Sequence, residues 1–348
     1  MIHSWLAVFV ALAAQGTQSD FIAREFKFAS GETLPRLTLH YTVLGQPRRD
    51  RRGVVRNAVL VLHGTGGTGR AFLAPTFAGV LFGPGQLLDT ARYYVVLPDG
   101  IGHGGSSKPS DGLRAKFPRF TYDDMVESQH LLLTEGLGVT HLRLVMGTSM
   151  GCMHSWVWGY TYPDFMDGLV PLACAPAQIA GLNRIRRKMI IDDIRLDPAW
   201  NGGDYASQPV AGLKAALQQL YLMSAAPLVQ LRQAPTRDGA DSLIVAWMGA
   251  RLRATDANDM LYQFEASRDY DPSSRLERVT APVLAINSAD DLVNPPELGI
   301  VERLMPGVSK GRFVLLPISP DTRGHGTHSL PAVWGGFLKD FLAALPER

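Results

Sequence analysis

Short apolar segments that close on glycine-rich turns are the feature that most constrains how this chain can fold. Four lie in the first half, at Ala58–His63, Tyr93–Leu97, Leu142–Met146 and Leu169–Ala173. Helical patterning separates them, and buried runs of this kind that alternate with helices are typical of parallel strands covered on both faces. Two further runs, Pro282–Asn287 and Arg312–Pro317, follow near the C-terminus. We therefore predict an α/β fold with a mostly parallel sheet flanked by helices.

The alternation is interrupted once and is preceded by a different pattern. Residues 21–46 form short alternating stretches broken by Ser30-Gly31 and Gly45, which predicts an antiparallel hairpin. Residues 176–270 show helices and loops without a convincing strand, so we interpret them as a helical cap inserted into the sheet. The core is then formed by residues 21–175 and 271–348. A length of 348 residues suits one such domain with an insertion.

Charge gives no reason to expect a nucleic-acid partner, because the net charge is +2 and acids and bases are interspersed. Two basic runs stand out. The first, Arg48–Arg52, is interpreted as a solvated turn. The second, Arg184–Lys188, is either the charged face of a surface helix, which we favour, or a set of cations that steers an anionic substrate.

The N-terminus carries an apolar run from Trp5 to Ala14 that ends in small residues, which resembles a secretory signal. It is shorter than the roughly 20 apolar residues that span a bilayer. We therefore expect residues 1–14 to be a signal peptide and the protein to be periplasmic or secreted. A retained anchor or a frayed arm is the alternative, and without a leader the protein would be cytoplasmic. No later segment predicts a stable membrane span.

The chain has two cysteines, Cys152 and Cys174, and neither has metal-ligand spacing. They follow neighbouring elements and are expected to lie close together. We favour two buried free thiols, with a single disulfide as the alternative in an exported protein. Neither a metal nor an organic cofactor is predicted.

A candidate nucleophile lies in the sequence Gly147-Thr148-Ser149-Met150-Gly151. This G-x-S-x-G pattern is directly between a predicted strand and a predicted helix. A serine on that sharp turn has its hydroxyl exposed at the carboxyl edge of the sheet, with glycines on both sides relieving the crowding. The alternative, a serine that only caps the helix, is disfavoured by this context.

A serine nucleophile needs a neighbouring base, usually a histidine held by a carboxylate. Asp290 and Asp291 follow the strand that ends at Asn287, and the spacing of Asp290 to Leu292 favours Asp290, with Asp291 as the alternate. His325 and His328 follow the last strand. The glycine-flanked His325 is the expected base, and His328 is the alternate.

An oxyanion hole requires two backbone donors near the nucleophile. We expect them to be the N–H groups of Met150 and of Thr65, which lies in the glycine-rich turn after His63. His63 itself is expected to hold that turn by hydrogen bonds.

These motifs resemble the α/β-hydrolase superfamily over almost everything after the leader, through His63-Gly64, Asp99-x-x-Gly-His-Gly, Gly147–Gly151 and Gly324-His325. Within it, the chain looks most like the homoserine O-acetyltransferase branch. The segments that carry this resemblance are Asp124-Met-Val-Glu-Ser-Gln, Gly-Thr-Ser-Met-Gly-Cys-Met-His-Ser-Trp, Tyr162-Pro-Asp, Asp197-Pro-Ala-Trp-Asn-Gly-Gly-Asp-Tyr and Asn294-Pro-Pro-Glu. The resemblance implies a triad of Ser149, Asp290 and His325.

We expect a serine hydrolase that cleaves a small-molecule ester, or less favourably an amide, through an acyl-Ser149 intermediate. The alternative is an O-acyltransferase that passes the acyl group to an amino-acid hydroxyl with the same triad. Trp156, Trp158, Trp200 and Trp247 either line an acyl pocket or belong to the core. Neither the substrate's identity nor the oligomeric state is indicated by the sequence.

Overall fold

The computed structural model describes residues 16–346, and the expected signal peptide, residues 1–14, lies outside the described residues. Its centre is one eight-stranded sheet in the order β1-β2-β4-β3-β5-β6-β7-β8. The strands are β1 (Thr17–Lys27), β2 (Thr33–Leu44), β3 (Ala58–Leu62), β4 (Tyr94–Pro98), β5 (Leu144–Thr148), β6 (Leu169–Leu172), β7 (Val283–Ser288) and β8 (Gly311–Leu316). This mostly parallel sheet confirms the predicted fold class.

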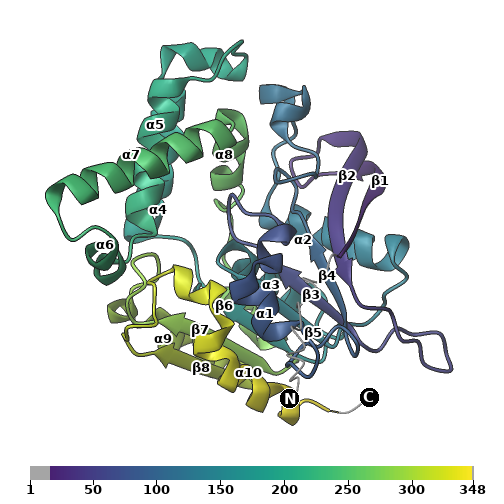
Figure 1. Ribbon diagram of the computed structural model, residues 1–348. Coiled ribbons are helices and arrows are strands. Elements are labelled where there is room, and N and C mark those ends of the chain that lie inside the picture. The colour runs from purple at the N-terminus through teal and green to yellow at the C-terminus, as the bar shows by residue number, and fades with distance from the viewer. Residues whose placement is uncertain (1–15, 347–348) are drawn as a thin grey trace, which may run out of the picture.

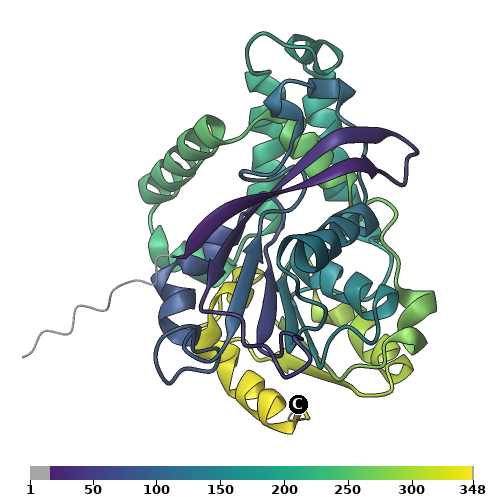
Figure 2. The ribbon, with the colours of Figure 1, turned by 90° about the vertical axis from the view of Figure 1, so that its right-hand side faces the viewer.

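The first two strands differ from the rest in direction and length. β1 pairs antiparallel with β2, and β2 pairs antiparallel with β4, whereas β4, β3, β5, β6, β7 and β8 are parallel to one another. The long β1–β2 hairpin, purple in Figure 2, extends well beyond the parallel strands. Its position matches the hairpin expected between residues 21 and 46.

Helices cover both faces of the sheet, and the alternation of side chains along each strand decides which face each residue serves. In β3, Leu60 and Leu62 pack in the cluster formed with α2 (Tyr122–Leu131) and α3 (Met150–Thr161). Val59 and Val61 point the other way, into the cluster formed with α1 (Pro75–Leu81) and α10 (Pro331–Ala344). The remaining short helix of the core is α9 (Ile300–Leu304).

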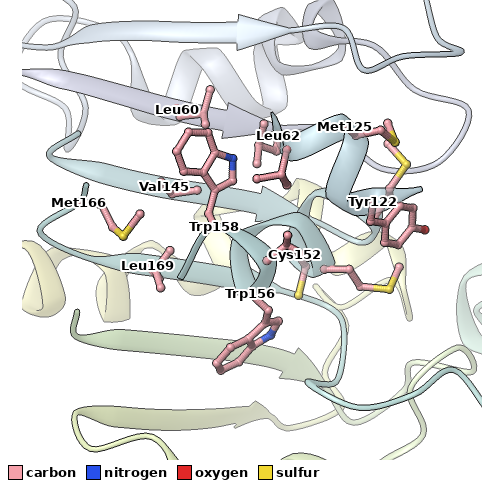
Figure 3. Close-up of a cluster of buried hydrophobic side chains, with 14 of the residues drawn as sticks. Leu60, Leu62, Tyr122, Met125, Val145, Cys152, Trp156, Trp158, Met166 and Leu169 are labelled. Carbon is pink, nitrogen blue, oxygen red and sulfur yellow. The ribbon is translucent and has the colours of Figure 1, made fainter. Parts of the chain in front are cut away.

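Helix α3 is buried along almost its whole length and fills the space over the central strands. Figure 3 shows Trp156 and Trp158 extending from α3 in different directions, with Trp158 near Leu60 and Val145. Both indoles are fully buried. Trp156 and Trp158 therefore belong to the core and not to an acyl pocket, which was the alternative interpretation.

The chain between β6 and β7 forms five α-helices, here called the cap (residues 181–265). They are α4 (Gly181–Leu196), α5 (Val210–Met223), α6 (Pro227–Gln233), α7 (Arg237–Ala254) and α8 (Ala257–Glu265). Figure 1 shows α4, α5, α7 and α8 gathered as a group beside the sheet. They enclose their own apolar cluster around Ile190, Leu213 and Phe264.

Shorter turns complete the chain. Single 3-10 turns lie at Gly69–Leu73, Pro109–Asp111, Arg114–Lys116, Pro198–Gly203, Ser273–Arg278, Pro296–Leu298, Met305–Gly307 and Gly326–Ser329, and a π turn at Leu132–Gly136 extends α2. Within residues 16–346, none of the helices combines the length and hydropathy needed to cross a membrane.

Candidate active site

Ser149 lies where β5 ends and α3 begins. Its backbone has φ 55° and ψ −110°, a left-handed conformation that a non-glycine residue adopts only when its surroundings impose it. The Ser149 N–H donates to the carbonyl of Leu172 on the neighbouring strand at 2.9 Å. The sharp turn that the sequence pattern predicts is therefore present at the carboxyl edge of the sheet.

The flanking glycines are required by close contacts between β3, β5 and α3. A Cβ at Gly147 would lie 1.9 Å from the carbonyl oxygen of Gly151, and a Cβ at Gly151 would lie 2.1 Å from that of Leu62. Real Cβ atoms do not approach backbone oxygens so closely, so any side chain at either position would push the helix off the sheet. The glycines thus fix where the Ser149 hydroxyl stands.

A chain of hydrogen bonds joins the serine to a histidine and a carboxylate. The Ser149 hydroxyl donates to Nε2 of His325 at 2.8 Å, and Nδ1–H of His325 donates to Oδ2 of Asp291 at 2.9 Å. His325 is 8% exposed and Asp291 is 1% exposed. The candidate nucleophile, base and orienting acid are therefore within hydrogen-bond reach of one another, as nucleophilic catalysis requires.

The structure corrects the choice of carboxylate. Asp290, the favoured candidate, makes no hydrogen bond to His325: its Oδ2 accepts from the Gly324 N–H at 2.9 Å, and its Oδ1 accepts from the Ser288 hydroxyl. The two aspartates are consecutive in the turn after β7, so their side chains leave the backbone in different directions. Asp291, the alternate, is the one that faces the imidazole.

Asp291 is held as an anion by its surroundings. Burial alone would raise the pKa of Asp291, but His325 and the hydrogen bonds from Asn294 and the Val293 N–H together bring that pKa below its ordinary value. The Val293 N–H donates at 2.8 Å and the Asn294 amide at 3.1 Å. Asn294 also donates to the Ala173 carbonyl, which ties the carboxylate to the end of β6. Asn294 opens one of the segments that carry the family resemblance, but its bond to Asp291 was not predicted from the sequence.

His328, the alternate base, lies beside the triad without joining it. Its ring stands edge-on to that of His325, with centroids 5.1 Å apart, and its Nδ1 accepts from the Ser329 hydroxyl. Burial, assisted by the charge of His325, lowers the pKa of His328 to about 3. His328 is therefore neutral at physiological pH and adds no positive charge next to His325.

The glycine-rich turn after β3 lies against the nucleophile. A Cβ at Gly64 would lie 3.2 Å from Cβ of Ser149, so main chain approaches the serine closely at this point. His63 bonds the Gly64 carbonyl through Nδ1 and accepts from the Gly100 N–H through Nε2, so it holds the turn. Thr65 lines the same cavity as Ser149, and Met150 begins α3; their N–H groups remain the proposed oxyanion donors.

A cavity of about 900 Å³ opens between the cap and the carboxyl edge of the sheet. Ser149 and His325 lie at its floor, and Leu217, Trp247 and Met260 of the cap contribute apolar wall. Its volume is at the upper end of the range of pockets that enclose small ligands. Trp247 is therefore a cavity residue, whereas Trp200 packs against the apolar cluster of the cap and donates to Asn258. Residues 16–346 contain no cluster of three or more His, Cys, Asp or Glu side chains suited to a metal.

Cys152 and Cys174 are joined by a disulfide, with their Cα atoms 5.9 Å apart, so the favoured interpretation as free thiols is wrong. Cys152 lies one turn into α3 after the nucleophile, and Cys174 follows β6. Because α3 packs against β6, the two residues come within bonding reach, as their place after neighbouring elements predicts. The disulfide ties the start of α3 to the edge of the sheet.

Residues 57–304 match a family described as "alpha/beta hydrolase fold". A homoserine O-acetyltransferase from Geobacter sulfurreducens is 30% identical over 371 residues, covering 94% of this chain and 96% of that protein.

Two solved structures share the architecture. The homoserine O-acetyltransferase of Bacillus anthracis has a TM-score of 0.82 at 23% identity, covering 95% of this chain and 98% of its own. An acetylester hydrolase from Corynebacterium glutamicum also has a TM-score of 0.82, at 19% identity, covering 94% of this chain and 96% of its own. At these identities the two structures establish the common fold.

Proposed function

Because the chain belongs to the α/β-hydrolase family, in its homoserine O-acetyltransferase-like branch, we propose that it transfers an acyl group through an acyl-Ser149 intermediate. The family membership confirms the resemblance expected from the sequence. The acyl donor is an ester or thioester, and the acceptor is the hydroxyl group of a small molecule. The observation that carries the proposal is the hydrogen-bonded series Ser149–His325–Asp291 at the floor of the cavity.

Each member of the triad has a defined task in this proposal. Nε2 of His325 takes the Ser149 proton as Oγ attacks the acyl carbon, and then gives the proton to the leaving group. Asp291 keeps the imidazole in the required tautomer and stabilises its cation. The backbone N–H groups of Thr65 and Met150 stabilise the negative charge that develops on the acyl oxygen. In the second half of the reaction His325 activates the acceptor hydroxyl in the same way.

Transfer to a hydroxyl acceptor is favoured over hydrolysis by the relatives. The Geobacter sulfurreducens protein is named a transferase and matches nearly the whole chain. A cavity of about 900 Å³ also has room for an acceptor beside the acylated serine. Hydrolysis, the reading favoured from sequence alone, is the second candidate, since the expected leader would place the enzyme away from cytoplasmic thioester donors.

Transfer and hydrolysis are distinguished by whether the acyl group of the acyl-enzyme passes to a hydroxyl acceptor or to water. We expect p-nitrophenyl acetate to acylate Ser149, and addition of homoserine to increase p-nitrophenol release and yield O-acetylhomoserine, as measured by mass spectrometry. Serine and a simple alcohol serve as further acceptors to show the preference. If acetate is the sole product at every acceptor concentration, the enzyme is a hydrolase and the transferase proposal fails.

We also propose that the protein is exported after removal of residues 1–14. The Cys152–Cys174 disulfide supports this, because disulfides persist in oxidising compartments and are rare in the cytosol of mesophiles. Protein recovered from the source cells should begin after residue 14 and react with no thiol reagent when denatured without reductant. Recovery in the cytoplasm with an intact N-terminus and two reactive thiols would contradict both expectations.

A further inference from the structure

The basic run Arg184–Lys188 on α4 is divided by the fold into side chains with different roles. Lys188 is 57% exposed and pairs with Asp192 one turn along the helix, as a solvated helix face predicts. Arg187, its neighbour in sequence, is 3% exposed and points inward. The interpretation of the whole run as a charged surface face is therefore wrong for Arg187.

Arg187 is a buried cation whose partners within residues 16–346 are all neutral. Its Nε donates to the Asn183 side chain at 2.9 Å, its Nη1 donates to the Ser267 hydroxyl at 3.0 Å, and its guanidinium lies 5.5 Å from the centre of the Phe264 ring. No carboxylate in this part of the chain lies within ion-pair distance of it. Burying a charge without a counter-charge costs free energy, so a buried arginine without a carboxylate partner indicates that a ligand supplies the counter-charge.

The guanidinium borders the place where the acyl chemistry would occur. Arg187 lines the large cavity together with Ser149 and His325. It also lines a smaller cavity of about 70 Å³, together with Ser149, Met153 and Cys174. A ligand group that reaches Arg187 is thus within the same enclosed space as the Ser149 hydroxyl.

A hydroxyl group that lines the large cavity together with Arg187, that of Thr65, makes no hydrogen bond to the described chain. The buried hydroxyl oxygen of Tyr122 makes none either. Burial raises the pKa of Tyr122, while the positive charge of Arg187 and the hydroxyls of Thr65 and Ser267 oppose that rise. A buried cation and a hydroxyl donor that line the same cavity suit an acceptor-only group such as a carboxylate.

We propose that Arg187 binds a carboxylate of the substrate, with the hydroxyl of Thr65 as a further donor. The proposal rests on acyl transfer at Ser149 and specifies its substrate class: an anionic acyl group, as in the half-ester of a dicarboxylic acid, or an anionic acceptor, as in a hydroxy acid. The carboxylate takes no part in bond making. It supplies the missing counter-charge and positions the reacting group over Ser149.

Two esters of similar length, one with and one without a carboxylate, test whether Arg187 binds an anionic acyl group. We expect Arg187→Gln to lower kcat/KM for mono-p-nitrophenyl succinate by about 10- to 100-fold, the usual range for loss of a hydrogen bond to a charged group, and to change p-nitrophenyl butyrate turnover by less than about threefold. Arg187→Lys, which keeps the charge and loses the planar fork, should fall between the two. Lys188→Gln removes an exposed cation from the same helix and should leave kcat/KM unchanged for both substrates.

To test whether Arg187 binds an anionic acceptor, the acetylated enzyme is given homoserine or 3-amino-1-propanol, which lacks the carboxylate. A selective loss for homoserine in Arg187→Gln places the carboxylate on the acceptor. A selective loss for the succinate half-ester places it on the acyl group. If every substrate falls by the same factor, or if none changes, Arg187 has no anion-binding role and the proposal is overturned.

Binding without turnover separates this proposal from the proposed function. Calorimetry should show that succinate binds to the Ser149→Ala variant. The double variant Ser149→Ala/Arg187→Gln should not bind succinate, and succinamide should bind to neither protein. This measurement also replaces the kinetic one if no ester acylates Ser149, an outcome that refutes acyl transfer but not the anion site. Equal binding of succinate with and without Arg187 overturns the anion site.

Discussion

Replacing Ser149 with alanine should lower kcat/KM for p-nitrophenyl acetate by about 10⁴- to 10⁶-fold, because loss of a triad nucleophile leaves only the oxyanion hole and substrate binding. The fold should be retained, since the Ser149 side chain serves His325 and caps no helix. The strained backbone at this position is imposed by contacts of Gly147 and Gly151, which the substitution leaves in place. Steady-state kinetics, with mass spectrometry of the acylated peptide, measures the effect.

Ser224→Ala provides the matched control. Ser224 lines the same cavity, but its hydroxyl donates to the Leu220 carbonyl and does not contact His325. We expect its kcat/KM to stay within about threefold of the parent, because it takes no part in acyl transfer. If Ser149→Ala kept turning over the ester at the parental rate, Ser149 would not be the nucleophile and the proposed function would fall.

The positions of the strands were predictable because buried parallel strands leave a strong local signal. Each expected run overlaps an observed strand to within two residues at either end, as at Leu142–Met146, which the structure places at Leu144–Thr148. The nucleophile turn was equally readable. Its glycines are dictated by backbone contacts between elements that the pattern itself identifies.

The choice between Asp290 and Asp291 could not be made from sequence, because both follow the same strand and both accept hydrogen bonds. Their roles are decided by how the turn after β7 meets the loop that carries His325. Asp290 faces the backbone of Gly324, which has φ 56°, and Asp291 faces the imidazole one residue further on. A difference of one residue in a turn leaves no trace in periodicity.

The burial of Arg187 and the disulfide were left as less favoured alternatives for a similar reason. A run of four basic residues among five predicts a solvated face, but a helix of 16 residues that is covered on one side must bury some members of any run. Arg187 falls on the covered side together with Ile190, Ile191 and Ile194. Whether the two cysteines form a bond depends likewise on how α3 packs against the sheet.

Asp291→Asn should lower kcat by about 10³- to 10⁴-fold, because the amide favours the wrong imidazole tautomer and cannot stabilise the imidazolium. Asp291 bonds Nδ1 of His325 at 2.9 Å and is almost fully buried, so its carboxylate is well placed to fix the imidazole. KM should change little, since Asp291 is shielded from the substrate by His325. Steady-state kinetics at saturating ester separates the two parameters.

Asp290→Asn makes the same chemical change one residue earlier and isolates the role of position. Its amide oxygen can still accept from the Gly324 N–H, so the His325 loop keeps its anchor. We expect kcat to fall by less than about 10-fold and the free energy of unfolding by about 1 kcal/mol, the usual scale for weakening one hydrogen bond. The reverse ranking, with Asp290→Asn the more damaging to kcat, would return the catalytic role to Asp290. Equal and small losses would show that His325 works without a carboxylate partner, and the triad would reduce to Ser149 and His325.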